Sequence, residues 1–364
     1  MIKLWLKRAT AHFDQFLLIT LLFTLLVALF VLYSASGQSM DRMMSQATNI
    51  IVALVILWIF ANIPPQHLQR VAVPLYLLGM LLLIGVFLFG DVSKGARRWL
   101  NLGVMRIQPS ELMRIAVPML LAWYFARRED ALRFVDYVIG AVMLALPVAL
   151  IVKQPDLGTA LLIAASGFYV LFLAGLSWRL LIGLGLSVAG LIPLVWPHLH
   201  DYQRRRIEIL FDPYQDPLGA GYHTIQATIA LGSGGLAGKG WLHGTQAQLD
   251  FLPERHTDFI FAVFGEEFGL LGNLLLLVLF SIIIARGMLI TINAQNTFSR
   301  LLAGSITLTF FTYAFVNMGM VSGILPVVGV PLPLISYGGT SLVTLMIGFG
   351  ILMSIQTHKK LMSA

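Results

Sequence analysis

Asp258 is the residue of this sequence that is best placed to act as a general base. It lies in the segment 254-ERHTDFIF-261, between polar residues and the start of a long apolar run. A carboxylate at the boundary between water and lipid is partly desolvated, which brings its pKa towards the working pH and lets it accept a proton from a substrate. The alternative role is structural, because an aspartate that precedes a helix can cap its free N–H groups.

A second group of charges occurs in the segment 106-RIQPSELMR-114, which has the features of a helix start. Glu111 lies one turn before Arg114, and Arg106 lies just outside the helix. Two guanidinium groups around one carboxylate could form a clamp for phosphate, because guanidinium offers paired donors to phosphate oxygens. The alternative is an ion pair between Glu111 and Arg114 within the helix.

Asp156, Glu266 and Glu267 also lie within or at the ends of apolar runs. An ionisable group in a membrane span is costly unless it is paired or hydrated, so each is a candidate functional residue. Pro155 interrupts the chain before Asp156, which could cap the helix that follows. One of the two adjacent glutamates could line a hydrated cavity, or they could form buried pairs with an arginine, and their roles stay open.

The composition indicates that membrane helices position these residues. The chain has 364 residues, of which 58% are hydrophobic and 11% are charged, and its mean hydropathy is +0.85. A soluble protein carries about 25% charged residues, so a soluble enzyme, a disordered protein and a secreted disulfide scaffold are excluded. Because the sequence has no cysteine, a thiolate metal site and a cysteine nucleophile are excluded as well.

Apolar segments of about 20 residues predict an all-α polytopic membrane protein with about ten transmembrane helices. The expected spans are 14–35, 45–62, 70–90, 109–127, 134–152, 158–175, 178–197, 259–286, 300–322 and 333–356. The first apolar run is long and is followed by further spans, so we interpret it as an uncleaved helix rather than a signal peptide. We expect a single membrane domain over residues 1–364.

Basic residues in the short loops predict the orientation. One set lies on a single side of the membrane if the number of spans is even: Lys3, Lys7, Arg8, Arg127, Arg128, Arg133, Arg286, Arg300, Lys359 and Lys360. By the positive-inside rule this side is cytoplasmic, so both termini are expected inside. The net charge of +7 then reflects loops and contacts with lipid headgroups rather than binding of nucleic acid.

Further basic residues fall on the opposite side, which is unusual for short loops. They are Lys94, Arg97, Arg98, Arg106, Lys153, Arg204, Arg205, Arg206, Lys239 and Arg255. Long loops escape the positive-inside rule, but the loop that carries Arg97 and Arg106 is short. An anionic ligand on the outer side would account for these cations. The alternative is that they pair with Asp91 and Glu111.

Two segments between the spans are expected to have structure of their own. Residues 198–258, between the seventh and eighth spans, are too many for a simple connector and include 232-GSGGLAGKG-240. This large extracytoplasmic loop should form re-entrant or interfacial structure. Near the C-terminus, prolines and glycines interrupt the apolar segment 325-LPVVGVPLPLISYGGTS-341. Such interruption is typical of a broken or re-entrant segment that lines a cavity.

Several motifs of other enzyme classes are absent from the sequence. It has no P-loop, no zinc-binding HExxH helix, no GxSxG elbow and no dinucleotide fingerprint. A nucleotide-driven pump and a nucleotide cofactor are therefore not expected.

The ordered set of motifs resembles the SEDS family (shape, elongation, division and sporulation) over nearly the full length. The motifs are 94-KGARRWLNLG-103, 106-RIQPSE-111, 154-QPDLGT-159, 216-DPLGAGYH-223, 240-GWLHGTQ-246, 252-LPERHTDFIF-261 and 325-LPVVGVPLPLISYGG-339. The chain is more similar to the rod-shape branch, which serves cell elongation, than to the division paralogue. The resemblance implies a ten-span fold in the bacterial inner membrane. It also implies a peptidoglycan glycosyltransferase that uses lipid II on the periplasmic side.

The resemblance also implies roles for individual residues. It places the essential carboxylate on Asp258 and further functional positions on Arg106, Glu111 and Asp156. Where related sequences often have lysine, this chain has Arg114, which keeps the charge in a wider donor group. A class B penicillin-binding protein is implied as the transpeptidase partner, together with the elongation machinery, the nascent glycan strand and membrane lipids.

The mechanism that fits these residues is an inverting glycosyl transfer. Asp258 would accept a proton from the 4-hydroxyl of the acceptor sugar, whose oxygen attacks the anomeric carbon of the donor, and undecaprenyl pyrophosphate would leave. Candidate substrate-binding residues are Lys94, Arg97, Arg106, Glu111, Arg114, Asp156, Arg204 and Arg255. Mg²⁺ or Mn²⁺ could bridge the phosphates, and no residue is assigned to the metal.

Two other functions fit the same pattern. A lipid II flippase or another secondary transporter would also have broken helices and acids within the membrane. A non-catalytic membrane scaffold for the cell-wall machinery would need only the helices and the loops.

Overall fold

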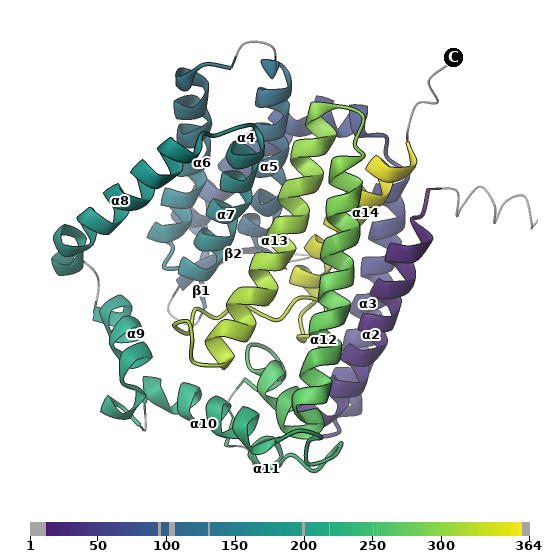
Figure 1. Cartoon of the computed structure of the whole chain (residues 1–364), viewed down its shortest axis with the longest axis vertical. Helices are drawn as coiled ribbons and strands as arrows, with labels where there is room; N and C mark the ends of the chain where they lie inside the picture. The colour runs from purple at the N-terminus through teal and green to yellow at the C-terminus, as the bar shows by residue number, and fades with distance from the viewer. Residues whose placement is uncertain are drawn as a thin grey trace, which may run out of the picture.

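Long helices make up most of the structure, which is a computed structural model (Figure 1). It describes residues 12–93, 96–101, 106–129, 132–198, 201–217, 219–249, 251–252 and 254–358. The long helices are α2 (Gln15–Ala35), α3 (Met40–Ala61), α4 (Pro65–Phe89), α5 (Pro109–Ala126), α6 (Phe134–Lys153), α7 (Leu157–Leu173), α8 (Trp178–Val195), α12 (Ile260–Ile292), α13 (Thr297–Val321) and α14 (Gly339–Thr357). Each of them overlaps one of the predicted spans, so the polytopic helical fold is confirmed.

Seven helices in the described part of the chain are long and apolar enough to cross a membrane, namely α2, α3, α4, α6, α12, α13 and α14. Helix α7 is shorter, with 17 residues, and α5 carries Glu111 and Arg114 in its first turns. Large apolar side chains on the outside of the bundle are exposed, for example Phe16, Leu81 and Phe89. An apolar outer surface of this kind suits contact with lipid.

Local capping explains where several helices begin. The side chain of Asp14 accepts a hydrogen bond from Leu17 N at 2.9 Å, and Asn296 does the same for Ser299 N at 2.8 Å. These bonds satisfy N–H groups that have no partner within the helix. Helices α4 and α5 instead begin with a proline at the first position.

Four boundaries differ from the prediction by five or six residues. Helices α3 and α4 begin earlier, at Met40 and Pro65, because their first turns are polar and hydropathy does not detect them. Helix α12 extends to Ile292 and is kinked at Gly269, where φ is +64°. Helix α14 begins only at Gly339, after a non-helical segment that contains three prolines.

A small antiparallel sheet was not predicted. Its strands are β1 (Asp91–Ser93), β2 (Ala96–Asn101) and β3 (Arg106–Ile107), in the order β1-β2-β3. Residue Leu100 pairs with Ile107 and Asn101 with Arg106. The sheet leads directly into α5, so it places the loop between α4 and α5 beside the start of α5.

The predicted loop between α8 and α12 is largely helical. It contains η2 (Trp196–His198), α9 (Asp201–Phe211), η3 (Pro213–Gln215), α10 (Ala220–Ser233) and α11 (Thr245–Gln248). Helices α10 and α11 lie at one end of the bundle, and both ends of the described chain lie at the other (Figure 1). The rings of His12 and His358 stack there with centroids 4.1 Å apart.

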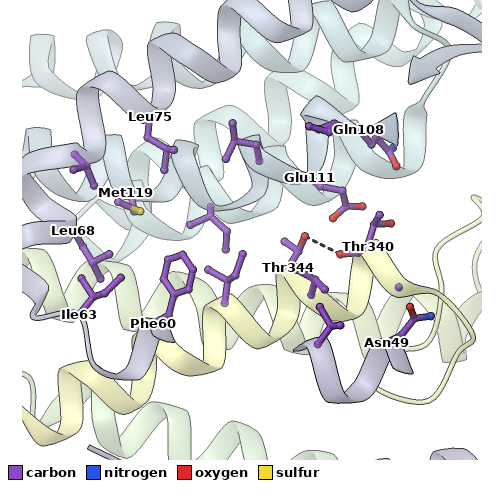
Figure 2. Close-up of a pocket in the computed structure, with 18 of the residues that line it drawn as sticks. Asn49, Phe60, Ile63, Leu68, Leu75, Gln108, Glu111, Met119, Thr340 and Thr344 are labelled. Carbon is purple, nitrogen blue, oxygen red and sulfur yellow. Dashed lines mark hydrogen bonds between the residues drawn. The ribbon is translucent and has the colours of Figure 1, made fainter. Parts of the chain in front are cut away.

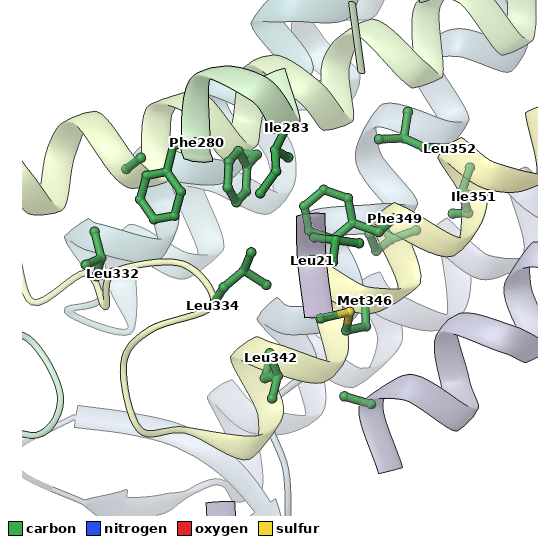
Figure 3. Packing of buried hydrophobic residues seen from close by; sticks show 14 of the residues in the cluster. Leu21, Phe280, Ile283, Leu332, Leu334, Leu342, Met346, Phe349, Ile351 and Leu352 are labelled. Carbon is green, nitrogen blue, oxygen red and sulfur yellow. The ribbon is translucent and has the colours of Figure 1, made fainter. Parts of the chain in front are cut away.

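The core joins the C-terminal helices to α2 and to the segment before α14. Figure 3 shows Leu332 and Leu334 among buried residues of other elements, including Phe280, Ile283 and Phe349. The non-helical segment 322–338 is therefore packed into the bundle by its apolar side chains.

Candidate active site

The first turns of α5, α7 and α14 and the residues before α12 lie close together at the loop end of the bundle. A methyl group added at Gly158, in α7, would lie 2.9 Å from Val328 O. One added at Gly329 would lie 3.5 Å from Asp258 Oδ2. The segment 322–338 therefore lies between the start of α7 and Asp258.

Asp258 lies two residues before α12 and is partly buried. Its backbone carbonyl accepts a hydrogen bond from Asn317 Nδ2 at 2.8 Å. The N-cap residue of α12 is Phe259, whose side chain makes no capping bond, so Asp258 does not occupy the N-cap position itself. Its role as a general base stays a prediction.

Glu111 and Arg114 form the ion pair that sequence reasoning held as the alternative to a phosphate clamp. Arg114 Nη1 donates to Glu111 Oε2 at 2.7 Å, and both side chains are largely buried. Arg114 Nη2 also lies 3.4 Å from Thr159 Oγ1, and the guanidinium lies 5.2 Å from the ring centroid of Tyr313. Arg114 thus links α5 to α7 and α13, and its contact with a phosphate stays a prediction.

Asp156 has the capping role that was expected. It is the N-cap residue of α7, and its Oδ1 accepts from Thr159 N at 3.3 Å. Its Oδ2 lies 3.6 Å from Arg98 Nε, while Arg98 Nη2 donates to Pro155 O at 3.0 Å. Asp156 was not among the partners suggested for the loop cations, which were Asp91 and Glu111. Because the small sheet was not predicted, the sequence did not distinguish Arg98 from its neighbours.

The structure places the other predicted cations as follows. Lys94 lies outside the described residues, and Arg97 and Arg106 lie on β2 and β3. Arg204 Nε donates to Trp196 O at 3.0 Å, so it ties α9 to the preceding turn. Arg255 donates to Ala247 O and joins α11 to the residues before α12.

Glu266 and Glu267 are buried and face different partners, as expected for adjacent helical residues. Glu266 Oε1 accepts from Lys239 Nζ at 2.7 Å, and also from Thr245 Oγ1 and Gln246 N. Glu267 accepts from the hydroxyl of Ser34. The suggestion of a buried pair is thus confirmed for Glu266, but the partner is a lysine rather than an arginine. These bonds hold the loop 234–248 against α12.

His223 lies on α10, next to the start of α12. Its ring stacks on the ring of Phe259 with centroids 5.8 Å apart. Burial lowers the pKa of His223, and the negative charge of Glu254 opposes this shift only in part. Burial therefore favours the neutral form of this imidazole, which stacks on the residue that follows Asp258.

A cavity of about 690 Å³ opens between α3, α4, α5 and α14. Figure 2 shows Glu111, Gln108, Thr340 and Asn49 at one end of it. The rest of its lining is mainly apolar and includes Phe60, Ile63, Leu68, Leu75 and Met119. A polar mouth with a long apolar interior is suited to an amphiphile whose charged group stays at the mouth.

Sequence reasoning missed this cavity, because its lining combines the consecutive helices α3, α4 and α5 with α14, which is distant in sequence. The predicted cavity-lining segment 325–341 contributes only Gly339 and Thr340 to it. The remainder of that segment packs beside Asp258 and α13.

Comparisons with known proteins identify the family. The model of the FtsW/RodA/SpoVE family, described as "Cell cycle protein", matches residues 13–361. The chain is 54% identical over 353 residues to "Peptidoglycan glycosyltransferase MrdB" of Escherichia coli strain K12, covering 97% of this chain and 95% of that protein. It is 38% identical over 302 residues to "Probable peptidoglycan glycosyltransferase FtsW" of Geobacter metallireducens, covering 80% and 78%.

Comparisons with solved structures also match this chain over nearly its full length. One, described as "Structural coordination of polymerization and crosslinking by a peptidoglycan synthase complex", matches with a TM-score of 0.84 and 31% identity over 96% of this chain and 99% of that chain. The crystal structure of the rod shape determining protein RodA of Thermus thermophilus matches with a TM-score of 0.72 and 27% identity, covering 96% and 98%. Together, the family match along residues 13–361 and the identity to curated relatives show that this chain belongs to the FtsW/RodA/SpoVE family, the SEDS proteins.

Proposed function

We propose that this protein is a peptidoglycan glycosyltransferase that joins lipid II units into β-1,4-linked glycan strands for cell elongation. Relatives that are named for this activity, at 54% and 38% identity, support the assignment. The observation that carries it is geometric. A partly buried carboxylate, Asp258, lies at the same end of the bundle as Arg98, Arg114 and the polar mouth of an apolar cavity.

Asp258 is the proposed general base. It would take the proton from the 4-hydroxyl of the acceptor N-acetylglucosamine while that oxygen attacks the anomeric carbon of the donor N-acetylmuramic acid. The new C–O bond forms as the bond to the pyrophosphate oxygen breaks on the opposite face, which inverts the configuration. The proton stays on Asp258 until solvent removes it.

The leaving group is a pyrophosphate, which needs neutralisation of charge more than it needs a proton. Arg114 pairs with Glu111 at the mouth of the cavity, and Arg98 lies beside Asp156 at the start of α7. No side chain caps the first N–H groups of α5 and α14. These groups are therefore proposed to add positive potential for the pyrophosphate. Arg106 and Lys94 complete the proposed set.

The undecaprenyl tail is proposed to occupy the apolar cavity between α3, α4, α5 and α14. The cavity volume of about 690 Å³ suits part of a long isoprenoid chain, and its mouth carries Glu111 and Gln108. A tail held there would place the pyrophosphate beside Glu111 and Arg114.

A divalent ion is proposed only as a bridge between phosphate oxygens. Among the residues that the structure describes, no group of three or more His, Asp or Glu side chains could hold a metal. Glu111 and Asp156 are moreover engaged by arginines. We therefore derive no catalytic step through Mg²⁺ or Mn²⁺.

We place the protein in the bacterial cytoplasmic membrane with both termini in the cytoplasm and the site on the periplasmic side. The multi-pass architecture and the distribution of basic residues in short loops support this orientation. A class B penicillin-binding protein is the proposed partner for cross-linking. The related synthase complex is described as coordinating polymerization and crosslinking.

Asp258→Asn tests the proposal. The full chain is reconstituted in vesicles with the penicillin-binding protein, and glycan formed from lipid II is measured. We expect a loss of at least about 100-fold, because a general base contributes about 10²–10⁴-fold. Asp212→Asn, in the same loop but exposed, is the control and should keep its rate.

Near-normal polymerisation by Asp258→Asn would remove the assignment of the base. Movement of lipid II across the vesicle membrane without any new glycan, in the wild-type chain, would instead favour a flippase.

A further inference from the structure

The backbone carbonyls of His256, Thr257 and Asp258 each accept a hydrogen bond from a residue in the C-terminal third of the chain. Tyr337 N donates to His256 O at 2.9 Å. Ser336 Oγ donates to Thr257 O at 2.6 Å. Asn317 Nδ2 donates to Asp258 O at 2.8 Å.

These bonds are needed because α12 does not hold this part of the chain. The helix begins at Ile260, and the N–H of Ala262 bonds to Phe259 O rather than to Asp258 O. The carbonyls of residues 256–258 thus lie outside the hydrogen-bond ladder of the helix. These carbonyls are partly buried, so they require partners from elsewhere in the fold.

Asn317 is the most constrained of the donors. Its side chain is fully buried, and the same amide nitrogen also donates to Val330 O at 2.7 Å. One amide group therefore joins the backbone of Asp258 to the segment 322–338. Ser336 adds a second link, since its hydroxyl accepts from Leu332 N at 2.7 Å while it donates to Thr257 O.

The segment 322–338 is itself firmly anchored. Leu332 and Leu334 are buried in the core, as Figure 3 shows. Gly329 of this segment lies beside the carboxylate of Asp258. The position of the base is therefore set by α13 and by a segment packed into the bundle, rather than by α12 alone.

We propose that Asn317 and Ser336 are positioning residues that hold the main chain at Asp258 so that its carboxylate meets the acceptor hydroxyl. The inference rests on the proposed role of Asp258 as general base. A base must lie within hydrogen-bond reach of the proton that it removes, and a displacement of about 1 Å can cost about 100-fold in rate.

The test uses the full chain in vesicles with its penicillin-binding protein. Asn317→Leu keeps the branching and the number of side-chain heavy atoms, although it is bulkier, and has no donor, and Ser336→Ala removes the hydroxyl. We expect each to lower kcat by about 10- to 100-fold while KM for lipid II changes by less than about threefold. Ser336→Thr keeps the hydroxyl and should restore the rate to within about threefold of wild type.

Thr312→Val is the matched control. Thr312 lies on α13, like Asn317, and the substitution removes a partly buried 2.6 Å hydrogen bond between Thr312 Oγ1 and Tyr169 Oη that does not involve Asp258. We expect no change in kcat for this variant. Thermal unfolding of each purified variant shows whether the fold is intact, and the two serine variants keep the test valid if Asn317→Leu does not fold.

A second readout tests whether Asn317 acts through Asp258. In an Asp258→Asn background, Asn317→Leu should lower the residual rate by less than about twofold, because the group that it positions is already disabled. A full loss in this background, or a rise in KM with kcat unchanged, would overturn the inference.

The two proposals fail separately. If Asp258→Asn polymerises normally, the base assignment fails. If Asp258→Asn is inactive while Asn317→Leu and Ser336→Ala keep wild-type rates, only the positioning inference fails.

Discussion

Arg114 Nη1 lies 2.7 Å from Glu111 Oε2, and the two side chains are only 9% and 13% exposed. The same guanidinium contacts Thr159 of α7 and faces the ring of Tyr313 of α13. Arg114 therefore balances a buried carboxylate. Its proposed second task, contact with the substrate pyrophosphate, can be tested separately from the first. Its paired state also means that a phosphate must compete with Glu111 for the guanidinium.

Removing the arginine charge separates these tasks. Arg114→Gln leaves Glu111 buried without its partner, so we expect a loss of about 3 kcal/mol in the free energy of unfolding. The double variant Glu111→Gln with Arg114→Gln should regain most of this stability, because no unpaired charge is left. It should still be inactive, because the cation for the pyrophosphate is missing. Thermal unfolding and glycan synthesis are measured on the same samples. A double variant that polymerises normally would show that Arg114 has no role towards the substrate.

Gly329 is expected to be required beside the base. Gly329→Ala introduces a methyl group 3.5 Å from Asp258 Oδ2, where the acceptor hydroxyl must approach. Gly323→Ala is the matched control, since φ is +76° at Gly329 and +73° at Gly323, but the nearest atoms to the added methyl are those of Thr228 and Thr224. Both variants should lose about 1 kcal/mol of stability. Only Gly329→Ala should lower kcat by more than about tenfold, and equal rates for the two would contradict the proposed geometry.

The cavity between α3, α4, α5 and α14 is expected to bind the isoprenoid tail. Leu75→Trp places extra volume inside it, whereas Leu78→Trp lies on the same helix with its side chain 50% exposed on the outside. We expect Leu75→Trp to raise KM for lipid II by about tenfold, because overpacking a cavity costs about 1–3 kcal/mol. The effect should shrink for substrate analogues with short tails. Initial rates at varied substrate concentration provide the measurement, and identical KM values for the two variants would rule out this tail path.

The stacked rings of His12 and His358 predict a pH dependence of stability. Burial and the proximity of His358 both lower the pKa of His12, so the folded state favours the neutral imidazole. Stability is then present above the ordinary histidine pKa of about 6.5 and is lost as the pH falls below it. We expect the melting temperature to fall between pH 7.5 and pH 5.5, and His12→Phe, which keeps a stacked ring without a titratable group, to reduce that fall. An unchanged pH dependence in His12→Phe would assign it to other groups.

The helices and some of their caps could be predicted from the sequence because they depend on local properties. A membrane span requires a run of apolar residues of sufficient length, and the prediction of 134–152 for α6 differs from Phe134–Lys153 by a single residue. The capping of α7 by Asp156 involves residues three positions apart, so it was also predictable. The first turns of α3 and α4 were missed because they are polar, and hydropathy alone does not detect a polar turn.

The partners of the charged residues could not be predicted in the same way. Arg98 and Asp156, Lys239 and Glu266, and Asn317 with the carbonyl of Asp258 are each brought together by packing of elements distant in sequence. Nothing in the local pattern distinguishes Arg98 from neighbouring cations, or lysine from arginine as the partner of Glu266. The apolar cavity is likewise formed by four helices, none of which forms a pocket alone.

The sequence by itself determined that this chain spans a membrane, where most of its helices lie, and which few charged residues could carry chemistry. Apolar length, capping residues and the cost of a charge in lipid are properties of single segments, so they can be read along the chain. The tertiary structure alone decided which charges neutralise one another, where the cavity opens and how Asp258 is held. Each of these features requires side chains or backbone groups of separate helices to come together in space. The sequence specifies such contacts only by specifying the complete fold.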